Sequence, residues 1–296
     1  MGFVKMVKPQ YPPRLWTIVG YPGSGKSTFA TQMRGPILAI DADSRFSEVL
    51  HLVGSEVYAL SSVATDNTDT EKIAALLEEN MPTSIIRTIV VDSLTAIITP
   101  LVTQAMMDND AKRNRNLAAA FKAKALAMRQ IQDAVTKWGK DVLWIYHLQD
   151  GRDGQGRKIT RATLPETEQT RLTRSINMRL EITQESERRG IKVVWARQGR
   201  SNMVLWDDTG KWEGMPERIE VAAYRGLSPE VQEIIKQGFP NISTAISWAI
   251  SQGAFGDETR ARSVYDEIKQ KNQPENASQM AQYWIDEVFR RQEPSK

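Results

Sequence analysis

The segment Gly20-Tyr-Pro-Gly-Ser-Gly-Lys-Ser27 decides the fold, because it matches G-x-x-x-x-G-K-[ST], the pattern of a phosphate-binding loop. Its glycines allow a tight turn in which successive backbone N–H groups point inward and hold an anion. Lys26 brings a positive charge to the β- and γ-phosphates, and the Ser27 hydroxyl can ligate Mg²⁺. The predicted nucleotide contacts are Gly20, Tyr21, Pro22, Gly23, Ser24, Gly25, Lys26, Ser27 and Thr28.

The sequence on both sides of this loop has the pattern of an α/β domain. An apolar run at 15–19 precedes the loop, and helix-prone residues 28–33 follow it. Further apolar runs, typical of parallel strands buried on both faces, alternate with helical patterns. The predicted strands are 36–40, 56–60, 88–91 and 142–146, and the predicted helices are 70–79 and 116–138. This alternation predicts a doubly wound, mainly parallel sheet with a P-loop.

Two further regions complete the predicted architecture. Segments 176–183, 191–197 and 202–206 are β-like and joined by short connections, so they predict a C-terminal antiparallel meander. From residue 216 onward, helical patterns dominate at 229–237, 242–252, 258–271 and 278–291. We therefore predict an ATPase core over 1–215 and a small helical C-terminal domain over 216–296. The tail's aromatic residues indicate a small core rather than a ligand site, and a docking or lid role is the alternative: Trp248, Tyr265, Tyr283, Trp284 and Phe289.

Composition narrows the class of protein. Of 296 residues, 41% are hydrophobic and 25% charged, which is ordinary for a globular protein. The chain has no cysteine, so disulfides and cysteine-ligated metal sites are excluded. No apolar run approaches the roughly 18 residues of a membrane span, and residues 1–10 lack the apolar stretch of a signal peptide. We expect a cytoplasmic protein with no membrane contact.

Polar residues follow three of the predicted strands, at the edge where such sheets bind ligands. Asp92 follows four apolar residues and is the expected Walker B carboxylate, so Ser27 and Asp92 are the predicted metal ligands. Hydrolysis also needs a carboxylate that orients or deprotonates water. Asp43 is the candidate base, because an extended chain would project it to the same side as Asp41. Two alternatives stay open: Asp43 caps a helix over 44–46, or Asp41 is the base.

The strand at 142–146 ends in His147-Leu-Gln149, which adds one more candidate to the site. Gln149 is the predicted sensor of the γ-phosphate, with His147 as its competitor. Either side chain could instead satisfy a hydrogen bond at the end of the strand.

Three segments together resemble the RecA recombinase core, and most closely the short phage-encoded RecA-like ATPases, some of which are single-strand annealing proteins. They are Ile-Val-Val-Asp-Ser-Leu-Thr-Ala at 89–96, Ile-Asp-Ala-Asp at 40–43 and Lys-Val-Val-Trp-Ala-Arg at 192–197. The resemblance covers about 14–207 and leaves out the helical tail. It implies an α/β P-loop NTPase of RecA type that uses ATP and Mg²⁺ and assembles into a filament or ring. The GTPase motif Asn-Lys-x-Asp is absent, which also favours ATP.

The resemblance assigns roles to individual residues. Arg197 matches a position that reaches the neighbouring subunit's ATP, with Arg200 in reserve, and a solvated edge-strand arginine is the alternative. RecA relatives carry Glu where this chain has Asp43, so the shorter side chain puts the hydrolysis rate in question. Two loops, at 108–116 and 150–169, match loops that hold single-stranded DNA. The predicted DNA-binding residues are Lys112, Arg113, Arg115, Arg152, Arg157, Lys158 and Arg161.

Contacts of this kind would give salt-dependent, sequence-tolerant binding. Three glycines between residues 151 and 156 predict a loop that becomes ordered on binding, and a solvated helix face with a flexible loop is the alternative. We therefore predict a RecA-like ATPase that binds single-stranded DNA and promotes annealing or strand exchange in recombination. A hexameric helicase or translocase motor, and a DNA loader or scaffold that uses ATP as a switch, are the alternatives. A single-strand-binding protein is a candidate partner, and a phage-encoded protein would act in the cytoplasm of its bacterial host.

Overall fold

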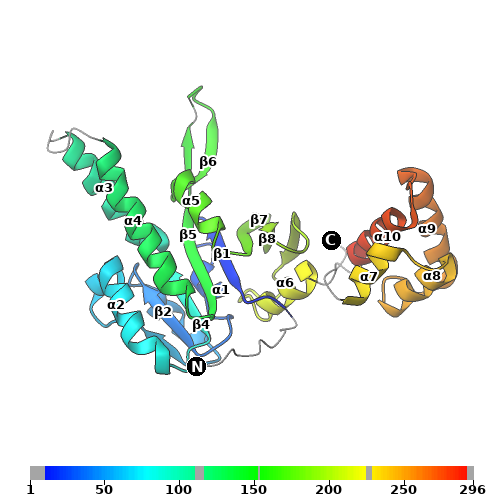
Figure 1. Cartoon of the computed structure of the whole chain (residues 1–296), viewed down its shortest axis with the longest axis horizontal. Helices are drawn as coiled ribbons and strands as arrows, with labels where there is room; N and C mark the ends of the chain where they lie inside the picture. Colours follow the sequence, from blue (N-terminus) through cyan, green and yellow to red (C-terminus); the bar gives the residue numbers. More distant parts are fainter. Residues whose placement is uncertain (1–10, 111–116, 153, 225–228, 292–296) are drawn as a thin grey trace, which may run out of the picture. The chain divides into compact units, whose positions relative to one another are not determined.

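The computed structural model describes residues 11–110, 117–152, 154–224 and 229–291, and Figure 1 shows the order of its elements. The strands are β1 (Leu15–Gly20), β2 (Ile37–Asp41), β3 (Val57–Ala59), β4 (Thr88–Asp92), β5 (Asp141–Arg152), β6 (Lys158–Ala162), β7 (Met178–Glu185), β8 (Arg188–Ala196) and β9 (Met203–Trp206). The α-helices are α1 (Lys26–Ala30), α2 (Thr70–Asn80), α3 (Leu94–Asp110), α4 (Leu117–Thr136), α5 (Glu166–Thr173), α6 (Met215–Tyr224), α7 (Pro229–Gln237), α8 (Ile242–Ser251), α9 (Glu258–Asn272) and α10 (Ala277–Arg291). Short 3₁₀ helices are η1 (Phe46–Leu52), η2 (Ala64–Asn67) and η3 (Met81–Thr83).

The strands form one sheet in which β1, the strand before the phosphate loop, lies between β5 and β7. The order is β3-β2-β4-β5-β1-β7-β8-β9, with β6 paired to β5. The strands from β3 to β7 in this order run parallel, whereas β8 and β9 run antiparallel to their neighbours. This topology confirms the predicted doubly wound sheet with its antiparallel meander. It also brings the carboxyl ends of β1, β2, β4 and β5 to one edge.

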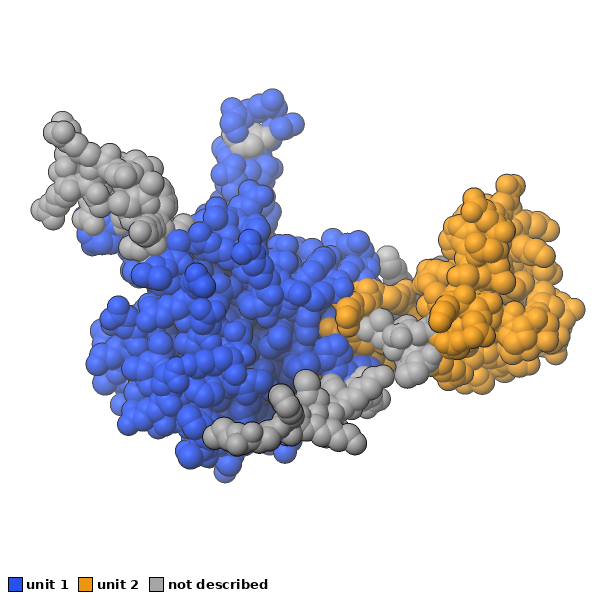
Figure 2. All heavy atoms as spheres, in the orientation of Figure 1, with its two compact units in different colours: residues 1–197, 201–219 blue, residues 198–200, 220–296 orange. Residues whose placement is uncertain are grey.

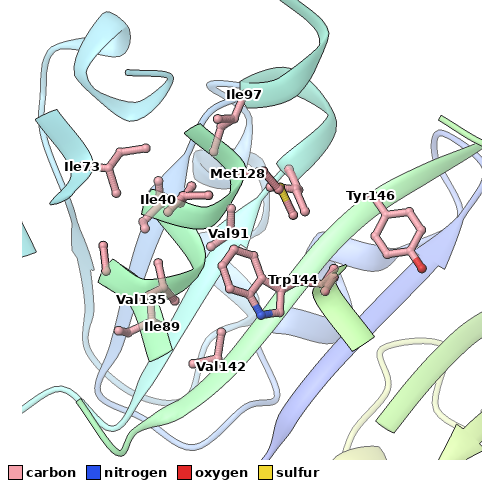
Figure 3. Close-up of a cluster of buried hydrophobic side chains, with 14 of the residues drawn as sticks. Ile40, Ile73, Ile89, Val91, Ile97, Met128, Val135, Val142, Trp144 and Tyr146 are labelled. Carbon is pink, nitrogen blue, oxygen red and sulfur yellow. The ribbon is translucent and has the colours of Figure 1, made fainter. Parts of the chain in front are cut away.

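One face of the sheet packs against α2, α3 and α4. Figure 3 shows Ile89 and Val91 of β4, Val142 and Trp144 of β5, and Met128 of α4 within this apolar cluster, and all five side chains are fully buried. Alternate residues of each strand face the cluster, as the two-residue period of a strand requires. Burying a side chain of this size contributes about 1.5–3 kcal/mol relative to leaving it exposed. The cluster therefore holds the strand ends in fixed positions.

Helix α1 packs on the opposite face of the sheet. Phe29 of α1 is fully buried outside the first cluster, as are Trp16 and Ile18 of β1, whereas Val19 belongs to that cluster. The sheet is thus covered on both faces, which explains why its central strands are continuous apolar runs.

The region around Gly151 differs from the prediction of a glycine-rich loop. Strand β5 continues to Arg152 and pairs antiparallel with β6, with Gln149 opposite Arg161 and Asp150 opposite Thr160. Figure 1 shows this β5–β6 hairpin extending away from the rest of the sheet. Residues 151–152 and 158–161 of the predicted loop are thus strand residues, because backbone pairing supplies hydrogen bonds that glycine content alone does not reveal. That this segment becomes ordered on binding stays a prediction.

Three α-helices of the described chain were not predicted from the sequence: α3, α5 and α6. Helix α3 contains Pro100 together with several β-branched residues, and both features lower helix propensity. Its apolar side chains are nevertheless buried on the sheet, for example Leu94, Ile97 and Ile98. Helix α6, which starts at Met215, also lies before the first helix predicted for the tail. Tertiary burial outweighs local propensity in α3.

The chain divides into two compact units, which Figure 2 colours separately. The first contains Met1–Arg197 and Ser201–Ile219, and the second contains Gln198–Arg200 and Glu220–Lys296. A division into functional domains at residue 216 stays a prediction. Within the residues that the structure describes, no helix combines the length and apolar character that a membrane span needs.

The second unit has an aromatic core of its own. Trp284 is fully buried, stacks on Phe255 with ring centroids 5.4 Å apart, and meets Tyr265 edge-on at 5.0 Å. Its indole Nε1–H donates to the backbone oxygen of Ala245 at 2.9 Å, so its polar group is satisfied inside the core. Trp248 and Phe289 also belong to this cluster, whereas Tyr283 is only partly buried.

Candidate functional site

The phosphate loop connects β1 to α1 through two glycines in left-handed conformations. Gly23 has φ of 76° and Gly25 has φ of 96°, values that residues with a side chain rarely adopt. Gly25 is also the N-cap of α1, and no side chain caps this helix. The free N–H groups at the start of the helix thus face the loop, which is the arrangement of an anion-binding site.

Lys26 lies inside the loop with only 5% of its surface exposed. Its Nζ donates to the backbone oxygens of Gly20 at 3.0 Å and of Tyr21 at 2.8 Å. Burial lowers the pKa of Lys26 to about 8, while the negative charges of Asp92 and Asp43 oppose that shift. These contacts hold the ammonium group of Lys26 within the loop.

The predicted metal ligands Ser27 and Asp92 are in direct contact. Ser27 Oγ donates to Asp92 Oδ2 at 2.6 Å, across the carboxyl ends of β1 and β4. Asp92 is almost fully buried, and this burial raises its pKa to about 6, with a further rise from Asp43. The hydroxyl of Ser27 and the charge of Lys26 act in the opposite direction.

The donor set fits Mg²⁺ and a phosphate chain. A hydroxyl and a carboxylate are hard oxygen ligands of the kind that Mg²⁺ takes beside phosphates. Ser24 Oγ, within the loop, is buried and has no hydrogen-bond partner among the described residues. A buried polar atom of this kind needs a partner, and a bound phosphate would supply one.

The two carboxylates after β2 have different surroundings. Asp41 accepts the backbone N–H groups of Arg45 and Phe46, both at 3.0 Å, so Asp41 caps this turn and Asp43 does not. The strand ends at Asp41 and Ser44 has φ of 55°, so the prediction of one extended chain through Asp43 is wrong. An aspartate that accepts hydrogen bonds from the backbone N–H groups that follow it favours a turn. The cap assigned to Asp43 is therefore rejected.

Asp43 lies beside the Walker B strand. Its backbone N–H donates to the backbone oxygen of Asp92 at 3.2 Å. Its negative charge raises the pKa values of Lys26, Asp92 and His147, so Asp43 lies near these three residues. The role of Asp43 as a base stays a prediction.

The structure separates His147 from Gln149. His147 pairs in register with Gly20 at the start of the loop, and burial lowers its pKa. Its backbone N–H approaches the hydroxyls of Thr95 and Thr163, each at 3.3 Å. Gln149 is exposed and lies two residues further along β5, opposite Arg161 in the hairpin. Its role as a sensor stays a prediction.

A loop residue, Tyr21, contacts the β5–β6 hairpin. The Tyr21 hydroxyl donates to Asp150 Oδ1 at 2.7 Å and lies 2.9 Å from Thr160 Oγ1. Asp150 also pairs with Lys158 at 2.8 Å, and the pKa of Asp150 is lowered by Lys158 and then by Tyr21. Asp150 and Thr160 were not predicted as neighbours of the loop, because only the strand register brings them to it.

The predicted DNA-binding residues fall into two groups. Four are exposed side chains of the hairpin: Arg152, Arg157, Lys158 and Arg161. The others lie outside the described residues: Lys112, Arg113 and Arg115.

Arg197 follows β8 and contacts α5 of its own subunit. Its Nη2 donates to the backbone oxygens of Thr173 at 2.9 Å, Arg174 at 3.0 Å and Ile176 at 3.1 Å. The guanidinium also lies 6.0 Å from the ring centre of Trp195. These bonds satisfy carbonyl groups at the end of α5. Arg197 is nevertheless exposed, and its role in a neighbouring subunit stays a prediction.

The fold and the site define a class. A doubly wound parallel sheet with an antiparallel meander, a phosphate loop after its central strand, and a buried aspartate at the end of β4 are the features of a P-loop NTPase of RecA type. The sequence profile of the AAA_24 family, described as an AAA domain, matches residues 13–204. The chain belongs to this family.

Comparison with other proteins gives more distant similarities. The crystal structure of the RadB recombinase is 16% identical with a TM-score of 0.37, over 66% of this chain and 87% of that one. A KaiC-like protein from the hyperthermophilic archaeon Pyrococcus horikoshii OT3 is 11% identical with a TM-score of 0.38, over 64% and 81% of the two chains. Comparison with curated proteins gave no match.

Proposed function

We propose that this protein is a Mg²⁺-dependent ATPase that binds single-stranded DNA and promotes annealing or strand exchange in recombination. One observation carries the proposal. The nucleotide loop and the cationic hairpin are joined through the Tyr21 hydroxyl, which bonds to Asp150 and lies against Thr160. A nucleotide in the loop and a DNA strand on the hairpin would thus contact two segments that Tyr21 joins by hydrogen bonds.

The nucleotide end of the proposal rests on the loop. Its backbone N–H groups and Lys26 hold the phosphates, and Ser27 and Asp92 hold Mg²⁺. When bound, Mg²⁺ neutralises charge on the phosphates during transfer. Asp43 is the proposed acceptor of the proton of the attacking water, because its charge acts on Lys26 and Asp92. Gln149 is the proposed γ-phosphate sensor.

The DNA end of the proposal rests on the hairpin. Its exposed Arg and Lys side chains suit the phosphates of an extended strand. Residues 150–163 contain no aromatic side chain, so backbone contacts rather than base stacking would dominate. Single-stranded binding through Arg152, Arg157, Lys158 and Arg161 would give a slope of about −3 in log Kobs against log salt concentration.

Pairing two strands requires several bound copies, so the proposal includes self-assembly into a filament or ring. Arg197 would then leave α5 and reach the ATP of the next subunit, where a cation stabilises charge during transfer. A single-strand-binding protein is the proposed partner, and the proposed location is the cytoplasm, that of a bacterial host if the chain is phage-encoded.

The test measures DNA binding and ATP hydrolysis on the same variants. Fluorescence anisotropy of a labelled single strand is recorded against salt, with and without a non-hydrolysable ATP analogue. Arg157→Ala with Arg161→Ala should weaken DNA binding and lower the salt slope. The matched control, Lys72→Ala with Arg87→Ala, removes two exposed cations from other parts of the same unit and should change neither.

Hydrolysis identifies the class of activity. Wild type should hydrolyse ATP faster with single-stranded DNA and anneal complementary oligonucleotides, and Lys26→Ala should lose nucleotide binding. ATP-driven unwinding of duplex DNA would favour a motor instead. ATP binding with no turnover would favour a switch. Equal DNA binding by the hairpin variant and wild type would refute the DNA-binding surface.

A further inference from the structure

Two residues far from the loop in sequence contact its outer carbonyl groups. Trp212 Nε1 donates to the backbone oxygen of Gly25 at 3.0 Å. Arg189 Nη1 approaches the backbone oxygen of Ser24 at 3.5 Å. Arg189 belongs to β8 of the meander, and Trp212 lies between β9 and α6. Neither residue is part of the phosphate-binding motif.

The segment that carries Trp212 is fixed by its own hydrogen bonds. Asp207 Oδ1 accepts the N–H of Thr209 at 3.0 Å and its hydroxyl at 2.8 Å. The Thr209 hydroxyl in turn accepts the N–H groups of Lys211 at 3.1 Å and Glu213 at 3.2 Å. Trp212 itself has φ of 63°, which is rare for a bulky residue and persists only where surrounding contacts enforce it.

Arg189 and Phe29 hold the indole ring of Trp212 in place. The Arg189 guanidinium lies 5.1 Å from the ring centre, and its Nη2 donates to the backbone oxygen of Gly210 at 2.6 Å. Phe29 of α1 meets the indole edge-on at 6.3 Å, and both rings are fully buried. A Cβ at Gly25 would lie 2.9 Å from Arg189 Nη1 and 3.0 Å from Trp212 Nε1. The fit against the loop is therefore close.

We propose that Trp212 and Arg189 are positioning residues that hold the phosphate loop in its anion-binding conformation. In a trans peptide, the C=O of one residue and the N–H of the next point in opposite directions. Holding the Ser24 oxygen outward therefore turns the Gly25 N–H inward. Holding the Gly25 oxygen outward does the same for Lys26, and this oxygen is shared by Trp212 and the N–H of Phe29 at 2.9 Å. The N–H groups of Gly25 and Lys26 belong to the set that receives the phosphates. The inference rests on the proposed nucleotide-binding function.

Such positioning removes part of the cost of ordering the loop when a ligand binds. Trp212 has the larger role, because it makes the shorter bond to the loop. Arg189 acts mainly through Trp212, by stacking on the ring and fixing Gly210. Loss of the indole N–H should therefore weaken nucleotide binding more than it disturbs the fold.

The chain offers a matched pair for the test. Arg188, adjacent to Arg189, lies 5.3 Å from the ring centre of Trp206 on β9. Trp206→Phe thus removes an indole N–H from an arginine–tryptophan pair of the same meander, away from the loop. Trp212→Phe removes the N–H that bonds to Gly25, together with part of the ring that packs on Arg189 and Phe29. The dissociation constant of a fluorescent ATP analogue with Mg²⁺ is measured for both variants and for wild type.

Trp212→Phe should raise this dissociation constant about 2- to 12-fold, the loss expected for one hydrogen bond, while Trp206→Phe should leave it unchanged. Arg189→Lys keeps the charge but loses the stacked plane, and should also weaken binding relative to Arg188→Lys. Melting temperature and nucleotide-free DNA binding are recorded for each variant. If Trp212 had a purely structural role, any loss of nucleotide affinity would be accompanied by a matching loss of melting temperature and of nucleotide-free DNA binding.

Nucleotide affinity equal to wild type in Trp212→Phe would overturn the positioning role while leaving the proposed function intact. If Trp212→Phe does not fold, the dissociation constants of Arg189→Lys and Arg188→Lys are compared instead, and equal values would overturn the positioning role. Failure of wild type itself to bind the analogue would overturn the proposed function and this inference with it.

Discussion

Replacing Asp92 by Asn should stabilise the metal-free protein even though it removes a predicted Mg²⁺ ligand. Burial raises the pKa of Asp92 from 3.8 to about 6, so the folded state binds this proton more tightly than the unfolded chain does. This difference of roughly 2 in pKa lowers the free energy of unfolding of the ionised protein by about 3 kcal/mol, at about 1.36 kcal/mol for each pKa unit. Asn has nearly the same shape, keeps an acceptor for the Ser27 hydroxyl and carries no charge.

The stabilisation has a defined pH window. Below pH 4 the carboxyl is protonated in both states, so Asp92 costs the wild type nothing. Between about pH 4 and pH 6 the unfolded chain has released a proton that the folded chain still holds, so wild-type stability falls as pH rises. Above about pH 6 the difference between Asp92→Asn and wild type levels off near its maximum of about 3 kcal/mol.

Urea unfolding of both full chains, followed by circular dichroism in EDTA from pH 4 to pH 8, measures this difference. The helical unit is the same in both proteins, so its contribution cancels. A difference that does not change with pH would refute the argument that Asp92 is buried as a charge. When the same two proteins are assayed with Mg²⁺ and ATP, without EDTA or urea, the variant should lose hydrolysis, and full activity would mean that the metal site lies elsewhere.

Three further outcomes are expected. Asp43→Glu should preserve or raise the rate of ATP hydrolysis and Asp43→Asn should nearly abolish it, and equal rates would remove Asp43 from the role of base. Arg197→Ala should lower the melting temperature, because three bonds to carbonyl groups at the end of α5 are lost. Mixing it with Lys26→Ala should restore part of the DNA-stimulated hydrolysis, and no recovery in confirmed mixed assemblies would restrict Arg197 to its own subunit. Gly25→Ala should weaken binding of the ATP analogue about 5- to 30-fold, because the left-handed backbone costs about 1–2 kcal/mol, whereas Gly54→Ala, with open space around it, should not.

The sequence predicts those parts of the fold and site that depend on local chemistry. The loop requires glycine where φ is positive, and a hydroxyl follows its lysine, so spacing alone identifies Gly25, Lys26 and Ser27. Asp92 is predictable because four apolar residues before a single carboxylate are typical of a buried strand end. Ser27 and Asp92 are in direct contact, and their role as metal ligands stays a prediction.

The remaining features depend on contacts that no local pattern encodes. Asp41 and Asp43 are two residues apart, and only the turn decides which carboxylate captures the N–H groups of Arg45 and Phe46. Trp212 bonds to Gly25 although the two residues are 187 positions apart in the sequence, and the pairing of β8 with β9 brings them together. In α3, apolar burial overrides the helix-breaking tendency of its proline.

The position of β1 within the sheet affects the order in which the sheet can form while the chain is being synthesised. Its hydrogen-bonded neighbours are β5 and β7, and both follow it by more than a hundred residues. At about 5–20 residues per second, the ribosome completes β7 roughly 8 to 30 s after it has made β1. The pair β2 and β4 can form earlier, because both strands emerge before β5. The nascent chain therefore acquires its phosphate loop late, and ATP can assist folding only after most of the sheet has left the ribosome.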